Sequence, residues 1–350
     1  MQIEICQESD PRWDEYVCAH PAGTFFHDSK WRKVLSTSFG YEPLYLIAED
    51  NGEVQGILPL FPVRSLLFGR SLVALPMAVY GGILATNDKA EALLLEKAKA
   101  LGIQHRAKYL ELRGNPYQQP IGAGGLDQLD SKKQKDLYVT FIGEIDPSDE
   151  VNLLRIPRKQ RRMVRQGEKH GLQFGFDNRR LSDFYRVYAA SVRNLGTPVY
   201  GYRYLQNIVE TFGERCKVFL VDYEGVAIAG VLVFFHQNQV LPYYGGALRE
   251  YSHLAPSDFM YWQLLRYGAA HGYKVFDFGR SKQGTGSFNF KRHWGFGPRP
   301  LPYVYYPIKG QLVPDTSSLN PNLQWAIRIW RNLPLKLTMM LGPRIVRHIP

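Results

Sequence analysis

The chain has 350 residues, of which 45% are hydrophobic and 21% charged, and its formal net charge is +11. This length suits two domains, and the composition argues against a disordered chain. The longest apolar runs fall short of the roughly 18 residues that a membrane-spanning helix needs. The positive charge favours polyanionic partners such as nucleic acid, phosphorylated carriers or an anionic membrane surface. The alternative is a basic protein without a polyanionic partner.

The cysteines and the first residues indicate the compartment. Cys6, Cys18 and Cys216 are odd in number and far apart, which suits neither a disulfide framework nor a metal site. The histidines show no H-E-x-x-H or similar metal-ligand spacing. The opening stretch MQIEICQESD is acidic and polar, unlike a signal peptide. We therefore expect a cytoplasmic protein without a bound metal.

The first part of the chain predicts a hairpin, a helix and a closing strand. Residues 42–63 form two apolar runs around Asn51-Gly52, a strong hairpin signal. A helical pattern follows at 88–104, where Asp88 and Glu91 suggest a capping box. The stretch KYLELRG at 108–114 then reads as a strand.

A basic helix is predicted at 157–170, after a strand at 137–145, with Pro157 at its start and Gly171 at its stop. The cations that share one face within about 100° are Arg158, Arg161, Arg162, Arg165 and Lys169. Like charges four residues apart repel, and an opposing polyanion would offset that repulsion. We expect this face to bind phosphate or nucleic acid; the alternative is a solvated face paired with carboxylates of the fold.

The second half repeats the plan of the first. A hairpin with a turn at Glu224-Gly225 precedes a helical pattern at 257–271 and a strand around 273–281. VYGGIL at 79–84 corresponds to YYGGAL at 243–248, so Tyr80 matches Tyr244. The repeat predicts an α/β (α+β) fold of two units with mixed sheets flanked by helices. The expected domains are 1–145 and 146–315, followed by a tail at 316–350.

The glycine-rich stretch FDFGRSKQGTGSFNFKRHWGFG at 276–297 matches none of the common nucleotide or nucleophile motifs. It also lacks the Q/R-x-x-G-x-G/A motif of acyl-CoA-binding acetyltransferases, because Ser281 stands where Gln or Arg is needed. Apolar and polar residues alternate after Gly286, so we predict a turn followed by a strand.

The tail at 322–350 mixes large apolar residues with five cations and holds no acid. Such a segment can lie on an anionic membrane. The alternative is that it packs on the core.

Several motifs resemble the FemAB family of non-ribosomal aminoacyl transferases, most closely the branch that accompanies exosortase (PEP-CTERM) and exopolysaccharide systems. Together they cover nearly the whole chain: HDSKW at 27–31, VYGG at 79–82, RIPRKQRRMVRQGEKHGL at 155–172, TPVYGYRYL at 197–205, YYGGA at 243–247 and FDFGRSKQGTGSFNFKRHWGF at 276–296.

The resemblance implies two tandem GNAT-like (acyl-CoA N-acyltransferase-type) domains and an acyltransferase of the EC 2.3 class. It implies transfer of an activated acyl or aminoacyl group to an amine of a cell-envelope or exopolysaccharide precursor. The implied donor is aminoacyl-tRNA or acyl-CoA, without a tightly bound cofactor. The implied partners are tRNA and a nucleotide- or lipid-linked saccharide precursor. Such an acceptor would suit peripheral contact of residues 322–350 with the inner face of the plasma membrane.

The resemblance also implies roles for individual residues. Phe290-Lys291 matches a family pair on a late strand beside the reacting ester, where Lys stabilises developing negative charge. Residues that match the family's acceptor-diphosphate ligands are Lys30, Tyr80, Arg203 and Tyr204. The alternative for Lys291 is an exposed strand lysine.

The residues themselves suggest further candidates. Asp277, at the end of its strand, is placed to accept the amine's proton, or else it pairs with Arg280 or Lys274. Arg280 and Lys282 are candidates for holding donor phosphates. Tyr244 lines a sugar or peptide groove or packs in the core.

Two other functions stay open from the sequence. One is an acyl-CoA-dependent N-acyltransferase acting on an amino sugar. The other is a non-catalytic module that binds an anionic polymer, which the basic helix would also suit.

Overall fold

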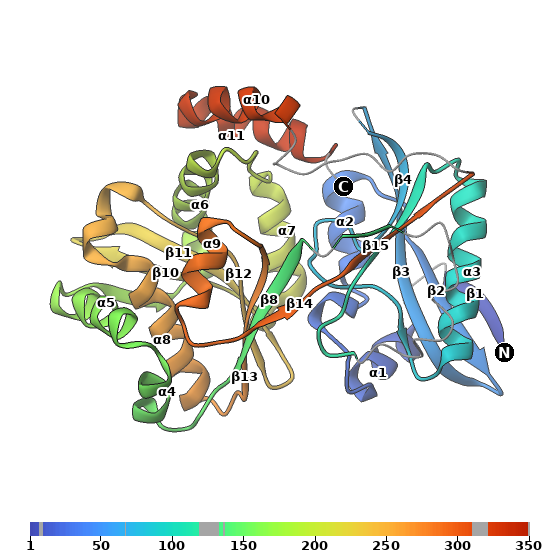
Figure 1. Cartoon of the computed structure of the whole chain (residues 1–350), viewed down its shortest axis with the longest axis horizontal. Helices are drawn as coiled ribbons and strands as arrows, with labels where there is room; N and C mark the ends of the chain where they lie inside the picture. The colour runs from blue at the N-terminus through green and yellow to red at the C-terminus, as the bar shows by residue number, and fades with distance from the viewer. Residues whose placement is uncertain (7–9, 67, 119–132, 136, 310–320, 349–350) are drawn as a thin grey trace. The chain divides into compact units, whose positions relative to one another are not determined.

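The computed structural model describes residues 1–6, 10–66, 68–118, 133–135, 137–309 and 321–348. The chain divides into two compact units. Unit 1 comprises residues 1–139, 300–316 and 347–350, and unit 2 comprises 140–299 and 317–346. Each unit contains a mixed sheet flanked by helices, which confirms the predicted α/β (α+β) class (Figure 1).

Unit 1 is built on a sheet with the strand order β1-β2-β3-β4-β6-β15-β7, and β5 pairs with β3. Its strands are β1 (Gln2–Cys6), β2 (Leu44–Asp50), β3 (Glu53–Ser65), β4 (Gly69–Ala74), β5 (Leu84–Ala85), β6 (Tyr109–Arg113), β7 (Lys133–Lys135) and β15 (Tyr303–Pro307). Its helices are α1 (Pro11–Ala19), α2 (Trp31–Phe39) and α3 (Asp88–Gln104). Leu94 and Leu95 of α3 belong to the same buried cluster as Leu58 and Leu110 of the sheet.

The expected hairpin, helix and closing strand of unit 1 are all present. Asn51 and Gly52 have φ of 51° and 84°, the left-handed pair that a tight hairpin turn requires. The helix cap differs from the expectation, because Asn87, not Asp88, is the N-cap and its side chain accepts from Ala90 N. Asn at this position satisfies an amide of the first turn that has no partner within the helix.

Unit 2 is built on a sheet with the strand order β14-β8-β13-β12-β11-β10-β9. Its strands are β8 (Tyr138–Glu144), β9 (Gln173–Phe176), β10 (Cys216–Tyr223), β11 (Val226–His236), β12 (Gln239–Ala247), β13 (Val275–Lys282) and β14 (Pro298–Pro300). Its helices are α4 (Asp149–Arg155), α5 (Arg158–Lys169), α6 (Leu181–Leu195), α7 (Tyr202–Phe212), α8 (Pro256–Ala270), α9 (Gly286–Arg292), α10 (Pro321–Asn332) and α11 (Leu335–Val346).

The two units share one order of elements. In unit 1, β2, β3 and β4 form an antiparallel meander, α3 follows, and β6 pairs parallel to β4. In unit 2, β10, β11, β12, α8 and β13 repeat that arrangement, and β13 pairs parallel to β12. The paired motifs are not equivalent in detail, because Tyr244 lies within β12 whereas Tyr80 follows β4 outside a strand.

Two strands differ from the expected division of the chain. Strand β8, expected within residues 1–145, lies in the sheet of unit 2, and β15 lies in the sheet of unit 1. The sequence assigns residues 146–315 to the second domain, yet β15 pairs with β6 in the sheet of unit 1, with Val304 opposite Leu112. Tyr303 is buried there and its hydroxyl donates to the carbonyl of Val79. A strand's partner is set by non-local pairing, which local patterns do not reveal. Residues 316–320 and 349–350 of the expected tail lie outside the described residues.

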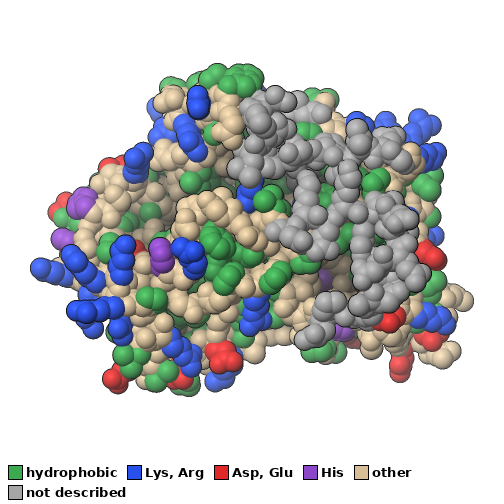
Figure 2. All heavy atoms as spheres, in the orientation of Figure 1, with side chains coloured by type: hydrophobic (Ala, Val, Ile, Leu, Met, Phe, Trp, Pro, Cys, Tyr) green, Lys and Arg blue, Asp and Glu red, His purple; other side chains and the backbone are tan. Residues whose placement is uncertain are grey.

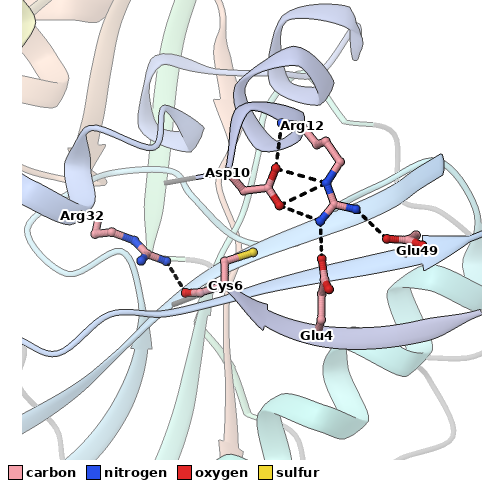
Figure 3. A network of polar contacts seen from close by, with 6 residues as sticks. All are labelled: Glu4, Cys6, Asp10, Arg12, Arg32 and Glu49. Carbon is pink, nitrogen blue, oxygen red and sulfur yellow. Dashed lines mark hydrogen bonds and ion pairs between the residues drawn. The ribbon is translucent and has the colours of Figure 1, made fainter. Parts of the chain in front are cut away.

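Arg12 of α1 organises a polar network in unit 1 (Figure 3). Its guanidinium pairs with Glu4, Asp10 and Glu49, each at 2.6 Å. Glu4, Cys6 and Asp10 lie close enough to hold a metal ion. Arg12 already neutralises both carboxylates, and burial raises the pKa of the Cys6 thiol to about 11, so the group is an ion-pair network.

Among the described helices, none combines the length and the apolar character that crossing a bilayer requires.

Candidate functional site

A buried lysine holds the end of β13 in a bend. Gly279 has a φ of +67°, a conformation that favours glycine. Lys291 is 9% exposed, and its Nζ donates to the carbonyls of Phe278 at 2.6 Å, Gly279 at 3.1 Å and Arg280 at 3.2 Å. Three donors of one ammonium therefore meet three consecutive carbonyls, which fixes the backbone of the second half of β13.

The strand expected after Gly286 is wrong, because residues 286–292 form helix α9. Thr285 caps it, its hydroxyl accepting from Phe288 N. Lys291 and Trp294 are buried and Phe288 is half-buried, at a spacing of three residues that suits one face of a helix. The alternation of polar and apolar residues fits both structures over so short a stretch, and the cap favours the helix. The Phe290-Lys291 pair thus lies on a helix.

Asp277 supports the same bend from inside the sheet. Its carboxylate is fully buried and accepts from Thr140 Oγ1 at 2.9 Å and from Gly279 N at 2.8 Å. Burial lowers the pKa of the Lys291 ammonium to about 7, and the negative charge of Asp277 opposes this lowering. Asp277 and Lys291 are therefore linked through the backbone at Gly279, and neither side chain is exposed to solvent.

Phe290 connects this bend to a pocket in unit 2. Its half-buried ring packs against Tyr261 and Trp294, with centroids 5.5 Å and 6.3 Å apart. The pocket beside it measures about 460 Å³. Its walls come from α6, from the segment after β12 and from the start of α8, and they include Ser191, Asn194, Ala247, Leu248, Arg249, Ser252, Ser257 and Asp258.

Asp258 is the site residue that the sequence analysis missed. It lies in the first turn of α8 and is 8% exposed. Gln160 Nε2 of α5 donates to its Oδ1. Burial raises the pKa of Asp258 to about 6. A carboxylate in a helix's first turn is an ordinary sequence feature, so only its burial in a pocket wall distinguishes it.

The start of α8 is poorly suited to bind a diphosphate. Helix N-termini bind phosphates through free backbone amides and a positive partial charge. Here the first residue is Pro256, which has no N–H, and Asp258 places a negative charge in the first turn. Ala255 before it has a φ of 55°, outside the helical range.

The basic face of α5 is one-sided, as predicted. Gln160, Val164 and Gly167 are buried and face α8, where a side chain at Gly167 would collide with Phe259. The opposite side presents Arg158, Arg162, Arg165 and Lys169, all exposed, and Arg161 is half-buried beside them. Lysines and arginines gather over α5 at the left of the molecule (Figure 2). Within the described residues, none of these five cations pairs with a carboxylate, so the alternative of a paired face is not supported.

The tyrosines near α7 form a buried cluster. Tyr204 and Tyr244 are 2% and 7% exposed, and their hydroxyls lie 3.0 Å apart. Burial raises the pKa of both well above the ordinary value, so both stay protonated. Arg203 is exposed on α7. The structure therefore brings Tyr204 and Tyr244 together in the core of unit 2, with Arg203 next to them along the chain.

The remaining candidates differ in exposure. In unit 1, Lys30 is exposed just before α2, and its backbone N–H donates to Asp28. Tyr80 is fully buried and packs edge-on against Phe26 at 5.5 Å. In unit 2, Arg280 is exposed beyond the Gly279 bend and Lys282 is half-buried.

Comparison with known proteins identifies related chains. A family model described as an acetyltransferase (GNAT) domain matches residues 155–292. Lipid II:glycine glycyltransferase of Staphylococcus haemolyticus is 22% identical over 373 residues, covering 81% of this chain and 87% of that protein. The protein of the same name from Staphylococcus aureus is 21% identical over 375 residues, covering 81% and 87%.

Solved structures agree on the fold. The crystal structure of FemX matches with a TM-score of 0.68 at 18% identity, covering 86% of this chain and 96% of that one. A tandem GNAT protein from the clavulanic acid biosynthesis pathway matches with a TM-score of 0.54 at 12% identity, covering 89% and 100%. The two units thus have the fold of these tandem GNAT-like structures, as expected. The chain is therefore similar in sequence to the lipid II:glycine glycyltransferases and in fold to FemX, and its residues 155–292 match an acetyltransferase (GNAT) domain.

Proposed function

We propose that this protein transfers an aminoacyl group from aminoacyl-tRNA to an amine of a lipid-linked cell-envelope precursor. The observation that carries the proposal is the connection between the basic face and the pocket. Helix α5 presents on one side cations that pair with no carboxylate in the described part of the chain, and on the other side its Gln160 donates a hydrogen bond to Asp258 in the pocket wall. A polyanion bound along α5 would lie on the same helix that supports the pocket. The relatives named lipid II:glycine glycyltransferase support the same reaction class.

The competing donor is acyl-CoA, which the GNAT family match favours. Against it stand Pro256 and Asp258 at the start of α8, which disfavour a diphosphate there. The basic face of α5, with its row of cations, instead suits the regularly spaced phosphates of a nucleic acid. We therefore infer tRNA as the donor's carrier.

In the reaction, the acceptor amine loses its proton and its nitrogen forms a bond to the ester carbon of the donor. The carbon–oxygen bond to the tRNA hydroxyl then breaks, and that oxygen takes up a proton. The chain's part is to hold both reactants together and to stabilise the oxyanion. We assign Phe290 to the pocket wall beside the reacting ester. We assign Lys291 and Asp277 to positioning, because their burial lets them act through the Gly279 bend.

The other assignments follow the exposure of the residues. Arg158, Arg161 and Arg165 would contact the donor's phosphates along α5, and Arg280 and Lys282 would contact those nearer the ester. Lys30 in unit 1 and Arg203 in unit 2 each keep the phosphate-binding role that the family resemblance implies for it. Tyr80, Tyr204 and Tyr244 would support these groups from the core. An exopolysaccharide precursor in a PEP-CTERM system, at the inner face of the plasma membrane, remains the narrower prediction for the acceptor.

The test is transfer of a labelled amino acid from charged tRNA. The purified chain is incubated with a set of aminoacyl-tRNAs and lipid-linked muropeptide or amino-sugar acceptors, and product is followed by mass spectrometry. Parallel reactions replace the donor with acetyl-CoA and longer acyl-CoAs. Aminoacylated product supports the proposal. Product from acyl-CoA alone would establish the amino-sugar acyltransferase, and binding of tRNA without product from any donor would favour the non-catalytic module.

A further inference from the structure

The pocket beside Phe290 is lined by Asp258, a carboxylate for which the described residues supply no cation. Asp258 is 8% exposed and forms no ion pair within the described residues. Arg249 also lines the pocket but is exposed, and it does not pair with Asp258. Taking a carboxylate out of water is costly unless a positive group or several hydrogen bonds offset the loss. The raised pKa of Asp258 reports that loss, since burial is its first cause.

A purely structural role explains Asp258 poorly. Its hydrogen bond to Gln160 joins α8 to α5. An asparagine could join the two helices as well, since an amide pairs with an amide and carries no charge to desolvate. The cations of α5 do not neutralise Asp258 either, because Arg158, Arg162 and Arg165 project from the side of the helix opposite Gln160.

The pocket has the size and polarity of a small-ligand site. Its volume of about 460 Å³ lies within the range of small-molecule sites, roughly 300–1,000 Å³. Its lining residues include Ser191, Asn194, Ser252 and Ser257, together with Phe290. Most of the lining surface is apolar, and Asp258 is the buried charged side chain among the lining residues, so a small ligand with one positive charge and little other polar surface fits it best.

We propose that this pocket is an ammonium-binding site in which Asp258 binds the primary amine of a substrate. An ammonium would supply the charge that Asp258 lacks, and the Phe290 ring would stack beside it. The identity of the amine rests on the proposed function, in which two substrates carry one. The α-amine of an aminoacyl donor and the nucleophilic amine of the acceptor share this chemistry. In the acceptor's case Asp258 would also receive the proton that the amine loses.

A binding experiment on the whole chain tests the site without any transfer reaction. Glycinamide supplies a small ammonium probe, and N-acetylglycinamide is its neutral match; binding is followed by NMR titration at pH 7. We expect glycinamide to bind the wild-type chain and N-acetylglycinamide to bind at least about tenfold more weakly. Asp258→Asn should lower the affinity for glycinamide to that of the neutral probe. Asp149→Asn, which removes the exposed partner of Arg266, should change neither affinity.

Equal binding of the two probes to the wild-type chain would overturn the proposal. So would unchanged glycinamide binding in Asp258→Asn, provided that thermal unfolding shows this variant folded. If Asp258→Asn does not fold, Asp258→Glu replaces it, since the longer carboxylate keeps the charge but moves it. Loss of binding in that variant supports a positioned carboxylate, and unchanged binding overturns the site.

The substrates identify which amine is bound. The affinities of aminoacyl-tRNA and N-acetylaminoacyl-tRNA are compared in the wild type and Asp258→Asn, and so are those of free and N-acetylated acceptor. A loss of about tenfold that is confined to the free-amine donor assigns the site to the donor, and the same loss with the acceptor assigns it to the acceptor. Glycinamide binding in a chain without transfer activity would refute the proposed function and support the site. Transfer that Asp258→Asn leaves unchanged would overturn the site alone.

Discussion

Lys291 Nζ lies 3.1 Å from the carbonyl oxygen of Gly279, the residue at which β13 bends. Gly279 N–H in turn donates to Asp277 at 2.8 Å. Both backbone polar groups of Gly279, its carbonyl and its N–H, are therefore hydrogen-bonded to buried charged side chains. The backbone conformation at Gly279 sets the direction in which the chain continues to Arg280 and Lys282. By holding that conformation, Lys291 of α9 orients exposed Arg280 and half-buried Lys282 at the end of β13.

Removing the Lys291 ammonium should destabilise unit 2. In Lys291→Met three carbonyls lose their donor at once, and we expect the free energy of unfolding to fall by about 2–4 kcal/mol. Urea unfolding followed by circular dichroism measures it. Lys274→Met, at an exposed position, should stay within about 0.5 kcal/mol of the wild type. A fully stable Lys291→Met variant that has lost only turnover would instead indicate direct contact of Lys291 with the reacting ester.

The bend itself can be tested at Gly279. A Cβ there would meet only Tyr243 Cδ2 at 3.9 Å, so Gly279→Ala costs backbone strain and creates no collision. We expect a loss of about 1–2 kcal/mol in unfolding free energy and a drop in turnover, because the orientation of Arg280 changes. Gly286→Ala is the control, since Gly286 has no positive φ and open space around it. Equal losses in both variants would show that the bend has no special role.

Asp258 should make the protein less stable as pH rises. Its pKa is about 6 in the folded chain against an ordinary value of 3.8, so the folded state binds the proton more tightly. Stability from this group is fully present below about pH 4 and is lost as pH rises through 6. Asp258→Asn should therefore match the wild type near pH 4 and exceed it at pH 7.5, by up to about 3 kcal/mol. Thermal unfolding across this range measures the difference, and a variant that is less stable at pH 7.5 would contradict it.

The basic face of α5 should govern the salt dependence of tRNA binding. Arg158→Gln and Arg165→Gln should each weaken binding and reduce the slope of log K against log salt by about 0.7–0.9. Fluorescence anisotropy with labelled tRNA over a salt series measures both quantities. Arg179→Gln removes an exposed cation of unit 2 that is not part of α5 and already pairs with Asp177, so it should leave the slope unchanged. If all three variants behave alike, net charge and not this helix face controls binding.

Two tryptophans of α10 allow the two alternatives for the tail, packing on the core and binding to an anionic membrane, to be tested separately. Trp330 is 8% exposed and its Nε1 donates to Thr197 O, whereas Trp325 is 65% exposed. Trp330→Ala should lower the unfolding free energy by about 3 kcal/mol. Trp325→Ala should leave stability unchanged and reduce co-sedimentation with anionic vesicles, because its ring is free to enter the interface.

Neutral vesicles are the control for the tail, since Arg328 and Lys336 would bind only an anionic surface. Equal sedimentation of Trp325→Ala and the wild type on anionic vesicles would remove the membrane role. The tail would then serve only to cover α6, on which α10 and α11 pack.

Much of the fold follows from local signals. Asn51-Gly52 and Glu224-Gly225 have backbones that favour tight turns, and the apolar runs around them have the period of strands. The one-sided charge of α5 is visible in the spacing of Arg158, Arg162 and Arg165, because a helix places residues four apart on one face. The internal repeat then indicates two similar units, since each copy presents the same order of elements.

The sequence by itself determined that the chain has two units with the same order of elements, that a basic helix lies between their repeated elements, and that one motif contains Phe290 and Lys291. Turn residues and periodicity are visible in short stretches of sequence, and a repeat is visible when two such stretches are compared. The tertiary structure alone decided that β15 completes the sheet of unit 1, that Lys291 is buried against three carbonyls, and that Asp258 faces a pocket. Strand partners and burial depend on residues far apart in the chain. The same carboxylate is ordinary in an exposed first turn and chemically significant once neighbouring elements take it out of water.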